Sequence, residues 1–89
     1  GNTISDMMKS ILEIQMMIAN EKYTVALNEV RMLRNKYPHV YYLLFLEGTC
    51  LYLNGMKKQA IRSYELALKY FPNNKVGWAT LKRLKGELE

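Results

Sequence analysis

The sequence predicts an all-α fold of antiparallel helix-turn-helix repeats, in which two hairpins and a C-terminal capping helix stack as an α-α superhelix. Apolar residues recur every three or four positions along most of the 89-residue chain, as they do on one face of a helix. The two prolines, Pro38 and Pro72, lie 34 residues apart. The same offset aligns four more identical pairs: Leu12 with Leu46, Glu13 with Glu47, Asn20 with Asn54 and Ala26 with Ala60. A period of this length is typical of repeat proteins, whose units bury their apolar faces against one another.

The first repeat is predicted at about residues 5–38. Its apolar spacing predicts one helix from about Ser5 to Ala19 and a second that ends at Tyr37, where Pro38 stops it. A turn near residues 20–21 separates the two helices.

The second repeat is predicted at about residues 39–72, with one helix on each side of Asn54-Gly55. These two residue types accept the positive φ angles that end a helix, and Pro72 ends the helix that follows. The helix that ends at Leu53 is apolar almost all round, and such a helix must be covered on several sides. We therefore expect it in the middle of the array, with helices packed before and after it.

A capping helix is predicted at about residues 74–88, after Asn73-Asn74, since either asparagine fits a helix N-cap. Its apolar residues repeat every three to four positions and are expected to face the core: Trp78, Leu81, Leu84 and Leu88. Its cations are expected to face away: Lys82, Arg83 and Lys85. A helix with one polar face suits the end of a stacked array.

The composition favours one domain over residues 1–89 and excludes several kinds of site. A single cysteine, Cys50, and a single histidine, His39, exclude a disulfide framework and a zinc site built from this chain alone. Cys50 lies in an apolar helix and is expected to be a core residue. Because Asp6 is the only aspartate and there is no Gly-rich loop or nucleophile motif, we expect no enzymatic activity, no metal and no cofactor.

The ends of the chain and its apolar runs bear on its location. It begins with Gly1 and Asn2 instead of Met, which indicates a processed or trimmed N-terminus. The longest apolar run, Val40–Leu53, has 14 residues and contains Glu47, whereas a membrane-spanning helix needs roughly 20. We therefore expect no membrane span and a cytoplasmic location.

Small, aromatic and proline residues recur at fixed positions of the repeats. The second repeat has Gly48, Ala60, Tyr64, Ala67 and Pro72, the first has Ala26 and Pro38, and Trp78 with Leu81 starts a third. In this spacing the chain resembles the tetratricopeptide repeat (TPR) family, whose 34-residue helix-turn-helix unit carries tryptophan, leucine, glycine, tyrosine, alanine, phenylalanine and proline. The resemblance covers nearly the whole chain.

Three positions depart from the family pattern. Ile14 stands where the first repeat would have glycine, and Glu13 and Glu47 stand where leucine is usual. A carboxylate near a packing face needs a partner, because burial without one costs several kcal/mol or protonates it. We expect a helix end, a tyrosine hydroxyl or a cationic neighbour to satisfy it. Binding a basic group of a partner protein would instead require the helices to be rotated from the family's arrangement.

The resemblance implies a concave groove, lined by the first helices of successive repeats, that binds a segment of a protein partner. The groove positions are Met8, Ile11, Gln15 and Ile18, then Tyr42, Phe45, Thr49 and Tyr52, and finally Val76, Ala79 and Arg83. Aromatic and methionine side chains there suit an apolar partner, although the same side chains also suit a core. We therefore expect a non-catalytic protein-protein interaction module, serving as an adaptor, co-chaperone or secretion-chaperone-like scaffold.

Some members of the family hold the C-terminal carboxylate of Hsp70 or Hsp90 chaperones with lysine, asparagine and arginine at fixed groove positions. In this sequence those positions carry Ile11, Gln15, Leu46, Val76 and Thr80. The carboxylate clamp is missing, so the expected ligand is an apolar helical or extended segment.

Two alternatives stay open. The first is a basic surface for RNA or anionic lipid, made by Lys57, Lys58, Arg62, Lys82, Arg83 and Lys85 in a chain of net charge +5. Because these cations spread over the outer faces of two helices, they are also typical of a solvated surface, and a nucleic-acid partner is not expected. The second alternative is self-association into a homo-oligomer, since two and a half repeats leave an apolar groove uncovered.

Overall fold

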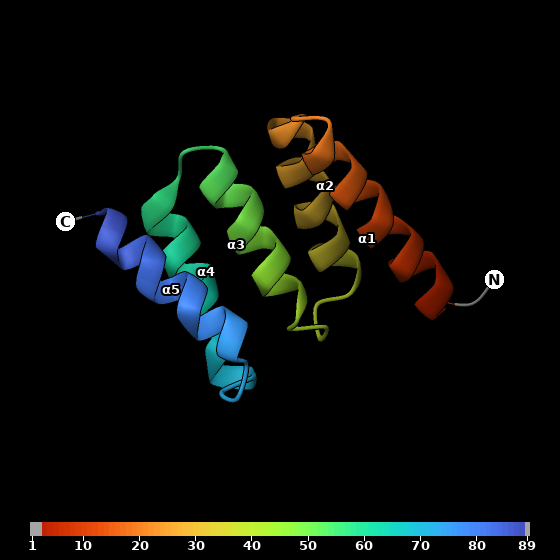
Figure 1. The fold of residues 1–89 in the computed structure, drawn as a ribbon. Coiled ribbons are helices and arrows are strands. Elements are labelled where there is room, and N and C mark those ends of the chain that lie inside the picture. The colour runs from red at the N-terminus through yellow and green to blue at the C-terminus, as the bar shows by residue number, and fades with distance from the viewer. Residues whose placement is uncertain (1–2, 89) are drawn as a thin grey trace.

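The computed structural model describes residues 3–88, and over this range the chain folds into helices joined by short turns. In chain order they are α1 (Thr3–Ala19), α2 (Tyr23–Lys36), α3 (Leu43–Leu53), α4 (Lys57–Tyr70) and α5 (Lys75–Glu87). Figure 1 shows α1 with α2 and α3 with α4 as two antiparallel hairpins, and α5 beside the second hairpin. The prediction of an all-α fold made of helical hairpins is confirmed.

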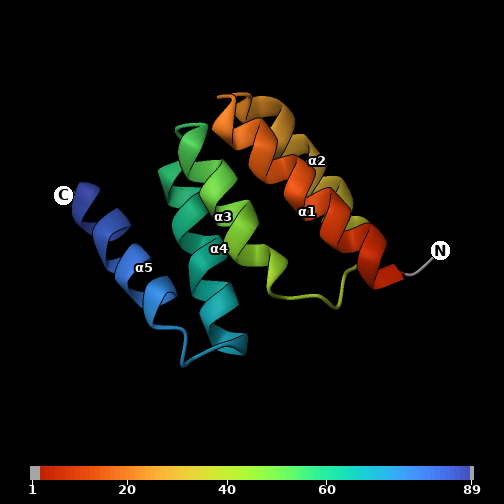
Figure 2. The same ribbon diagram turned by 45° about the vertical axis from the view of Figure 1, so that its right-hand side comes forward.

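The described part of the chain is elongated, with extents of 46 × 28 × 19 Å. Figure 2 shows α1 and α5 at its two ends and α3 between them. Gly1, Asn2 and Glu89 lie outside the described residues. Gly1 and Asn2 are the residues on which the expectation of a trimmed N-terminus depends, and Gly1 and Glu89 are the two ends of the domain expected over residues 1–89. No helix within residues 3–88 combines the length and the apolar character needed to cross a membrane.

The two hairpin turns have the same hydrogen bonds at positions 34 residues apart. The backbone N–H groups of Glu21 and Gly55 donate to the carbonyls three residues earlier, at 3.0 and 2.9 Å. The side-chain amides of Asn20 and Asn54 donate to the carbonyls four residues earlier, at 3.0 and 2.7 Å. Glu21 and Gly55 also share a positive φ, 60° and 77°, which only glycine adopts without steric cost. The 34-residue period of the sequence is therefore also a period of backbone geometry.

The C-terminal ends of α2 and α4 match in the same way. The C-cap residues Tyr37 and Phe71 have φ, ψ angles of −126°, 67° and −129°, 67°. Each donates its backbone N–H to the carbonyl four residues earlier at 2.9 Å. Pro38 and Pro72 follow directly, and proline both lacks an N–H and keeps the preceding residue out of the helical region. Both prolines therefore end their helices as predicted.

The core is centred on α3, which packs against α2 on one side and α4 on the other. This is the central place that its nearly all-apolar surface predicted. Its buried apolar residues are Leu43, Leu44, Cys50 and Leu51, and Cys50 has no exposed surface at all. Ala26, Val30 and Ala60 are also fully buried, where their small size lets the neighbouring helices approach.

Two expectations about the ends of the array are wrong. Leu81 and Leu84 of α5 face the core, but Trp78 and Leu88 remain about half exposed. The Trp78 indole instead donates to the Pro72 carbonyl at 2.8 Å. On α1, Glu13 is exposed instead of lying at a packing face. These side chains are exposed on α1 and α5, the first and last helices of the described chain, beyond which it supplies no further helix to cover them.

Candidate functional site

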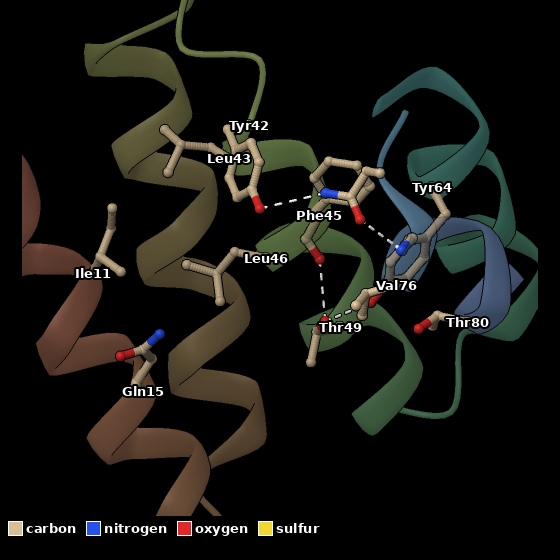
Figure 3. Close-up of a pocket in the computed structure, with 12 residues that line it drawn as sticks. Ile11, Gln15, Tyr42, Leu43, Phe45, Leu46, Thr49, Tyr64, Val76 and Thr80 are labelled. Atoms are coloured by element: carbon tan, nitrogen blue, oxygen red, sulfur yellow. Dashed lines mark hydrogen bonds between the residues drawn. The ribbon is translucent and has the colours of Figure 1, made fainter. Parts of the chain in front are cut away.

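A groove of about 620 Å³ lies between α1, α3 and the start of α5. Its walls come from segments far apart in the sequence, and Figure 3 shows the side chains of α1 and α5 on opposite sides of those from α3. The lining residues are Ile11, Gln15, Tyr42, Leu43, Phe45, Leu46, Thr49, Tyr64, Asn74, Val76, Gly77 and Thr80. None of these side chains carries a formal charge.

An aromatic cluster forms the end of the groove next to α5. The ring of Tyr42 lies 5.1 Å from that of Phe45 and 5.1 Å from that of Phe71, both in edge-on geometry. Phe45 also meets the ring of Tyr64 at 5.9 Å. Such edge-to-face pairs hold ring orientation as well as burying area. Phe45 is therefore partly a core residue, whereas Tyr42 keeps 56% of its surface exposed.

Gly77 fixes how closely α5 approaches this cluster. A Cβ at residue 77 would lie 2.8 Å from Cε1 of Phe45 and 3.0 Å from Cδ2 of Leu68. Those contacts are too short for a side chain larger than hydrogen. Glycine at this position lets the first turn of α5 close one side of the groove.

The polar atoms of the groove largely bind one another. Thr49 donates its hydroxyl to the Phe45 carbonyl at 3.1 Å and lies 2.6 Å from the Tyr64 hydroxyl. Asn74 caps α5 by accepting from the Gly77 N–H at 2.8 Å, and its amide donates to the Tyr42 hydroxyl at 3.4 Å. With these groups already paired, the free surface that the groove offers is mainly apolar.

Six of the expected groove residues line this groove: Ile11, Gln15, Tyr42, Phe45, Thr49 and Val76. Met8, Ile18, Tyr52, Arg83 and Ala79 do not belong to its lining. Met8 and Ala79 are exposed on α1 and α5, and Ile18 packs against the core. Val76 has 77% of its surface exposed at the rim, the largest fraction among the exposed large apolar residues of the described chain.

Tyr52 and Arg83 belong to a separate polar cluster that joins the end of α3 to the end of α5. The Tyr52 hydroxyl donates to Glu87 Oε1 at 3.0 Å, and Lys57 Nζ lies 3.1 Å from the same oxygen. The Arg83 guanidinium lies over the Tyr52 ring, 5.8 Å from its centroid. The hydrogen bond from Lys57, followed by that from Tyr52, lowers the pKa of Glu87 below its usual value. This cluster fixes the C-terminal end of α5 instead of exposing Tyr52 to a partner.

The sequence did not single out Leu43, Tyr64, Asn74 or Gly77 as groove residues. For Asn74 the sequence did contain a signal, since it was one of two predicted helix N-caps. An N-cap side chain lies at the start of its helix, which here borders the groove. Its bond to Tyr42 spans 32 positions of sequence and had no local signature.

The five residues that the TPR resemblance places at carboxylate-clamp positions all line this groove: Ile11, Gln15, Leu46, Val76 and Thr80. No cation stands at any of them, so a peptide carboxylate would find no opposite charge in the lining. Comparison of the chain with protein-family models, with curated proteins and with solved structures found no match.

Proposed function

We propose that this chain is a non-catalytic interaction module of the TPR type, which binds an apolar helical or extended segment of a protein partner in its groove. The observation that carries the proposal is the uncharged groove of about 620 Å³ lined by the leading helix of each hairpin and by α5. Such a module would act as an adaptor or a chaperone-like scaffold. It needs no catalytic group, since its work is recognition.

Exposed apolar side chains at the rim are the second support for this proposal. Tyr42 and Val76 both line the groove and keep most of their surface in water. Large apolar surface next to a concave site is typical of protein interaction surfaces. An amphipathic helix places anchors at positions i, i+3, i+4 and i+7, and a groove of this kind accepts such a row.

The cations of the chain favour this proposal over a polyanion-binding surface. Lys57 pairs with Glu87 at 3.1 Å, and Lys85 pairs with Glu65 at 3.4 Å. Arg83 lies over the ring of Tyr52. Two of the six cations of the alternative RNA or lipid surface thus have a carboxylate partner within the chain, which reduces the local positive potential, and a third lies over an aromatic ring.

The proposal is tested by capturing proteins with the wild type, with Val76→Glu and with the control Val25→Glu. Both valines are exposed in the first turn of a helix, where a glutamate is favourable toward the helix dipole. Both variants are therefore expected to fold. Only Val76 lines the groove. We expect a partner protein that binds the wild type and Val25→Glu but does not bind Val76→Glu. The same result is expected after nuclease treatment.

The same variants separate the alternatives. Capture that disappears with nuclease, or that Val76→Glu leaves unchanged, contradicts groove binding. Sedimentation equilibrium of the purified chain addresses self-association. A dimer that Val76→Glu dissociates and Val25→Glu does not would make a second copy the occupant of the groove.

A further inference from the structure

A second cleft, chemically unlike the groove, lies between α2, α3 and α4. It has a volume of about 230 Å³ and shares no lining residue with the groove. Arg31 and Arg34 of α2 and Arg62 of α4 stand around it. An adjoining hollow of about 470 Å³ is lined by the same Arg31 and Arg34. We call the surface formed by Arg31, Arg34 and Arg62 the arginine cleft.

The floor of the arginine cleft is a buried carboxylate that fixes one of the three guanidinium groups. Glu47, only 8% exposed, accepts from Arg34 Nη1 at 2.9 Å and from the Ser63 hydroxyl at 3.5 Å. One of the five N–H donors of Arg34 is used in this bond, so the others remain for a ligand. Glu47 thus acts as a positioning residue for Arg34.

The other two arginines have no anionic partner in the described chain. Within residues 3–88, neither Arg31 nor Arg62 forms an ion pair. Both side chains are exposed. They come from α2 and α4, the two helices that pack against α3, and they line one cleft. Three guanidinium groups against one carboxylate leave a local charge of +2. Cations gathered in this way repel one another until an anion joins them.

The charge and the shape of the donors indicate which anion fits. A phosphomonoester carries a charge of about −1.5 to −2 at neutral pH, which matches the excess, whereas a carboxylate carries one charge. Guanidinium groups bind phosphate oxygens through paired N–H donors, and this geometry favours Arg over Lys for such recognition. The small cleft admits one phosphoryl group and its linkage. Leu66, an exposed apolar side chain of the lining, offers a contact for a residue beside that group.

We propose that the arginine cleft binds a phosphorylated side chain of a protein partner, with Arg31, Arg34 and Arg62 as the ligands of its phosphoryl oxygens. A nucleic-acid backbone presents a row of phosphates and needs a row of cations to follow it. The arginine cleft is instead a single concentrated site. Because it shares no residue with the groove, it is independent of the function proposed for the groove.

The test is a titration of the chain, followed by amide and arginine Nε–Hε NMR signals at constant ionic strength. The probes are a blocked phosphoserine peptide with an apolar residue beside the phosphoserine, its unphosphorylated form, inorganic phosphate and a single-stranded RNA oligonucleotide. The variants are Arg62→Gln and Arg31→Gln, and the matched control is Lys69→Gln, an exposed cation of α4 that lines neither cleft.

We expect the phosphopeptide to give saturable shifts at the three arginines and the unphosphorylated peptide to give none. Arg62→Gln and Arg31→Gln should each weaken binding about tenfold or more, the effect of losing one charge-assisted hydrogen bond. Lys69→Gln should change it less than twofold. Inorganic phosphate should bind the same three arginines more weakly than the peptide.

Three results would overturn the proposal. Linear shifts without saturation, or an equal loss in Lys69→Gln, would reveal only general electrostatic attraction. Inorganic phosphate binding as tightly as the peptide would exclude a protein source of the phosphoryl group. RNA binding that is tighter than phosphopeptide binding, and that Lys69→Gln weakens as much as Arg62→Gln does, would assign the cations to a polyanion surface.

Discussion

Gly48 of α3 lies directly against the ring of Tyr64 of α4. A Cβ at residue 48 would be 2.8 Å from both Cδ2 and Cε2 of that ring and 3.5 Å from the Ala60 carbonyl oxygen. The close approach of the two helices also brings the Tyr64 hydroxyl within 2.6 Å of Thr49 in the groove. One glycine therefore sets both the packing of the second hairpin and the position of a groove side chain.

Replacing Gly48 with alanine is expected to destabilise the chain. The Tyr64 ring is buried and must move, and overpacking of this kind costs about 1–3 kcal/mol. Alanine recovers up to about 1 kcal/mol through its better helix propensity. We expect a net loss of about 1 kcal/mol in the free energy of unfolding, measured by urea denaturation.

Gly86→Ala is the control, because a Cβ at residue 86 meets nothing within 4 Å. Gly86→Ala should be neutral or stabilising, and a loss as large as that of Gly48→Ala would contradict the packing argument.

The ion pair between Arg34 and Glu47 provides a second prediction. It joins the two hairpins, with Arg34 Nη1 2.9 Å from Glu47 Oε1. Glu47 is buried, whereas the Arg34 side chain is 37% exposed. Arg34→Ala leaves a buried carboxylate with Ser63 as its remaining hydrogen-bond partner. Because Arg34 is partly solvated, we expect this variant to lose about 2 kcal/mol of the free energy of unfolding, less than for a fully buried pair.

A double-mutant cycle with Arg34→Ala and Glu47→Ala measures this pair directly. The coupling free energy should be about 1 kcal/mol and should fall when salt is added, since part of the pair is exposed. Additive losses in the two single variants would mean that the pair contributes only packing.

Local signals were enough to predict most of the fold. Pro38 and Pro72 ended their helices, Gly55 marked a turn and Asn74 marked a cap, because each acts through its own backbone or its nearest turn. The central place of α3 followed from its apolar surface alone. The expectation that Trp78 faces the core was wrong. The apolar periodicity of the α5 sequence shows which face of the helix is apolar, but it does not show whether another helix covers that face.

The candidate site was less accessible to sequence reasoning, since its contacts join residues distant along the chain. Arg34 is 13 positions from Glu47, and Tyr52 is 35 positions from Glu87. The sequence required a partner for the Glu47 carboxylate, and the structure supplies a cation. The sequence offered no reason to exclude Tyr52 from the groove, because its position depends on how α5 packs against the end of α3. Helical periodicity specifies a face of one helix, while tertiary packing decides what that face meets.

Cys50 provides a prediction about pH. Burial, with a further contribution from the charge of Glu47, raises the pKa of the Cys50 thiol from its ordinary 9.0 to about 11. The unfolded chain therefore releases the thiol proton at lower pH than the folded chain does. The stability linked to Cys50 is complete below pH 9.0 and is lost as pH rises from 9.0 to about 11. Within that window the free energy of unfolding should fall by about 1.4 kcal/mol per pH unit through this group.

The measurement compares the free energies of unfolding of wild type and Cys50→Ala in urea at several pH values, so that the difference isolates the contribution of the thiol. The difference in the free energy of unfolding should be constant below pH 9.0 and should shrink as pH rises toward 11. Alkylation of native wild type at about pH 8 should be far slower than alkylation in denaturant, because the thiolate is the reactive form. Equal alkylation rates in the two conditions would show that Cys50 is accessible.

The final prediction concerns the contact of Glu87 with Lys57 and Tyr52, which fixes the end of α5. Because its hydrogen bonds favour the ionised form, Glu87 contributes stability above its ordinary pKa of 4.5, and this is lost as pH falls through its lowered pKa. A carbon-detected NMR titration of the Glu87 carboxyl should therefore give a midpoint below 4.5.

Lys57→Met removes the largest cause of the lowered pKa and should raise that midpoint, whereas Lys58→Met, which changes an exposed neighbour, should leave it unchanged. Identical midpoints in wild type and Lys57→Met would mean that α5 is not held at this end by the Lys57 pair.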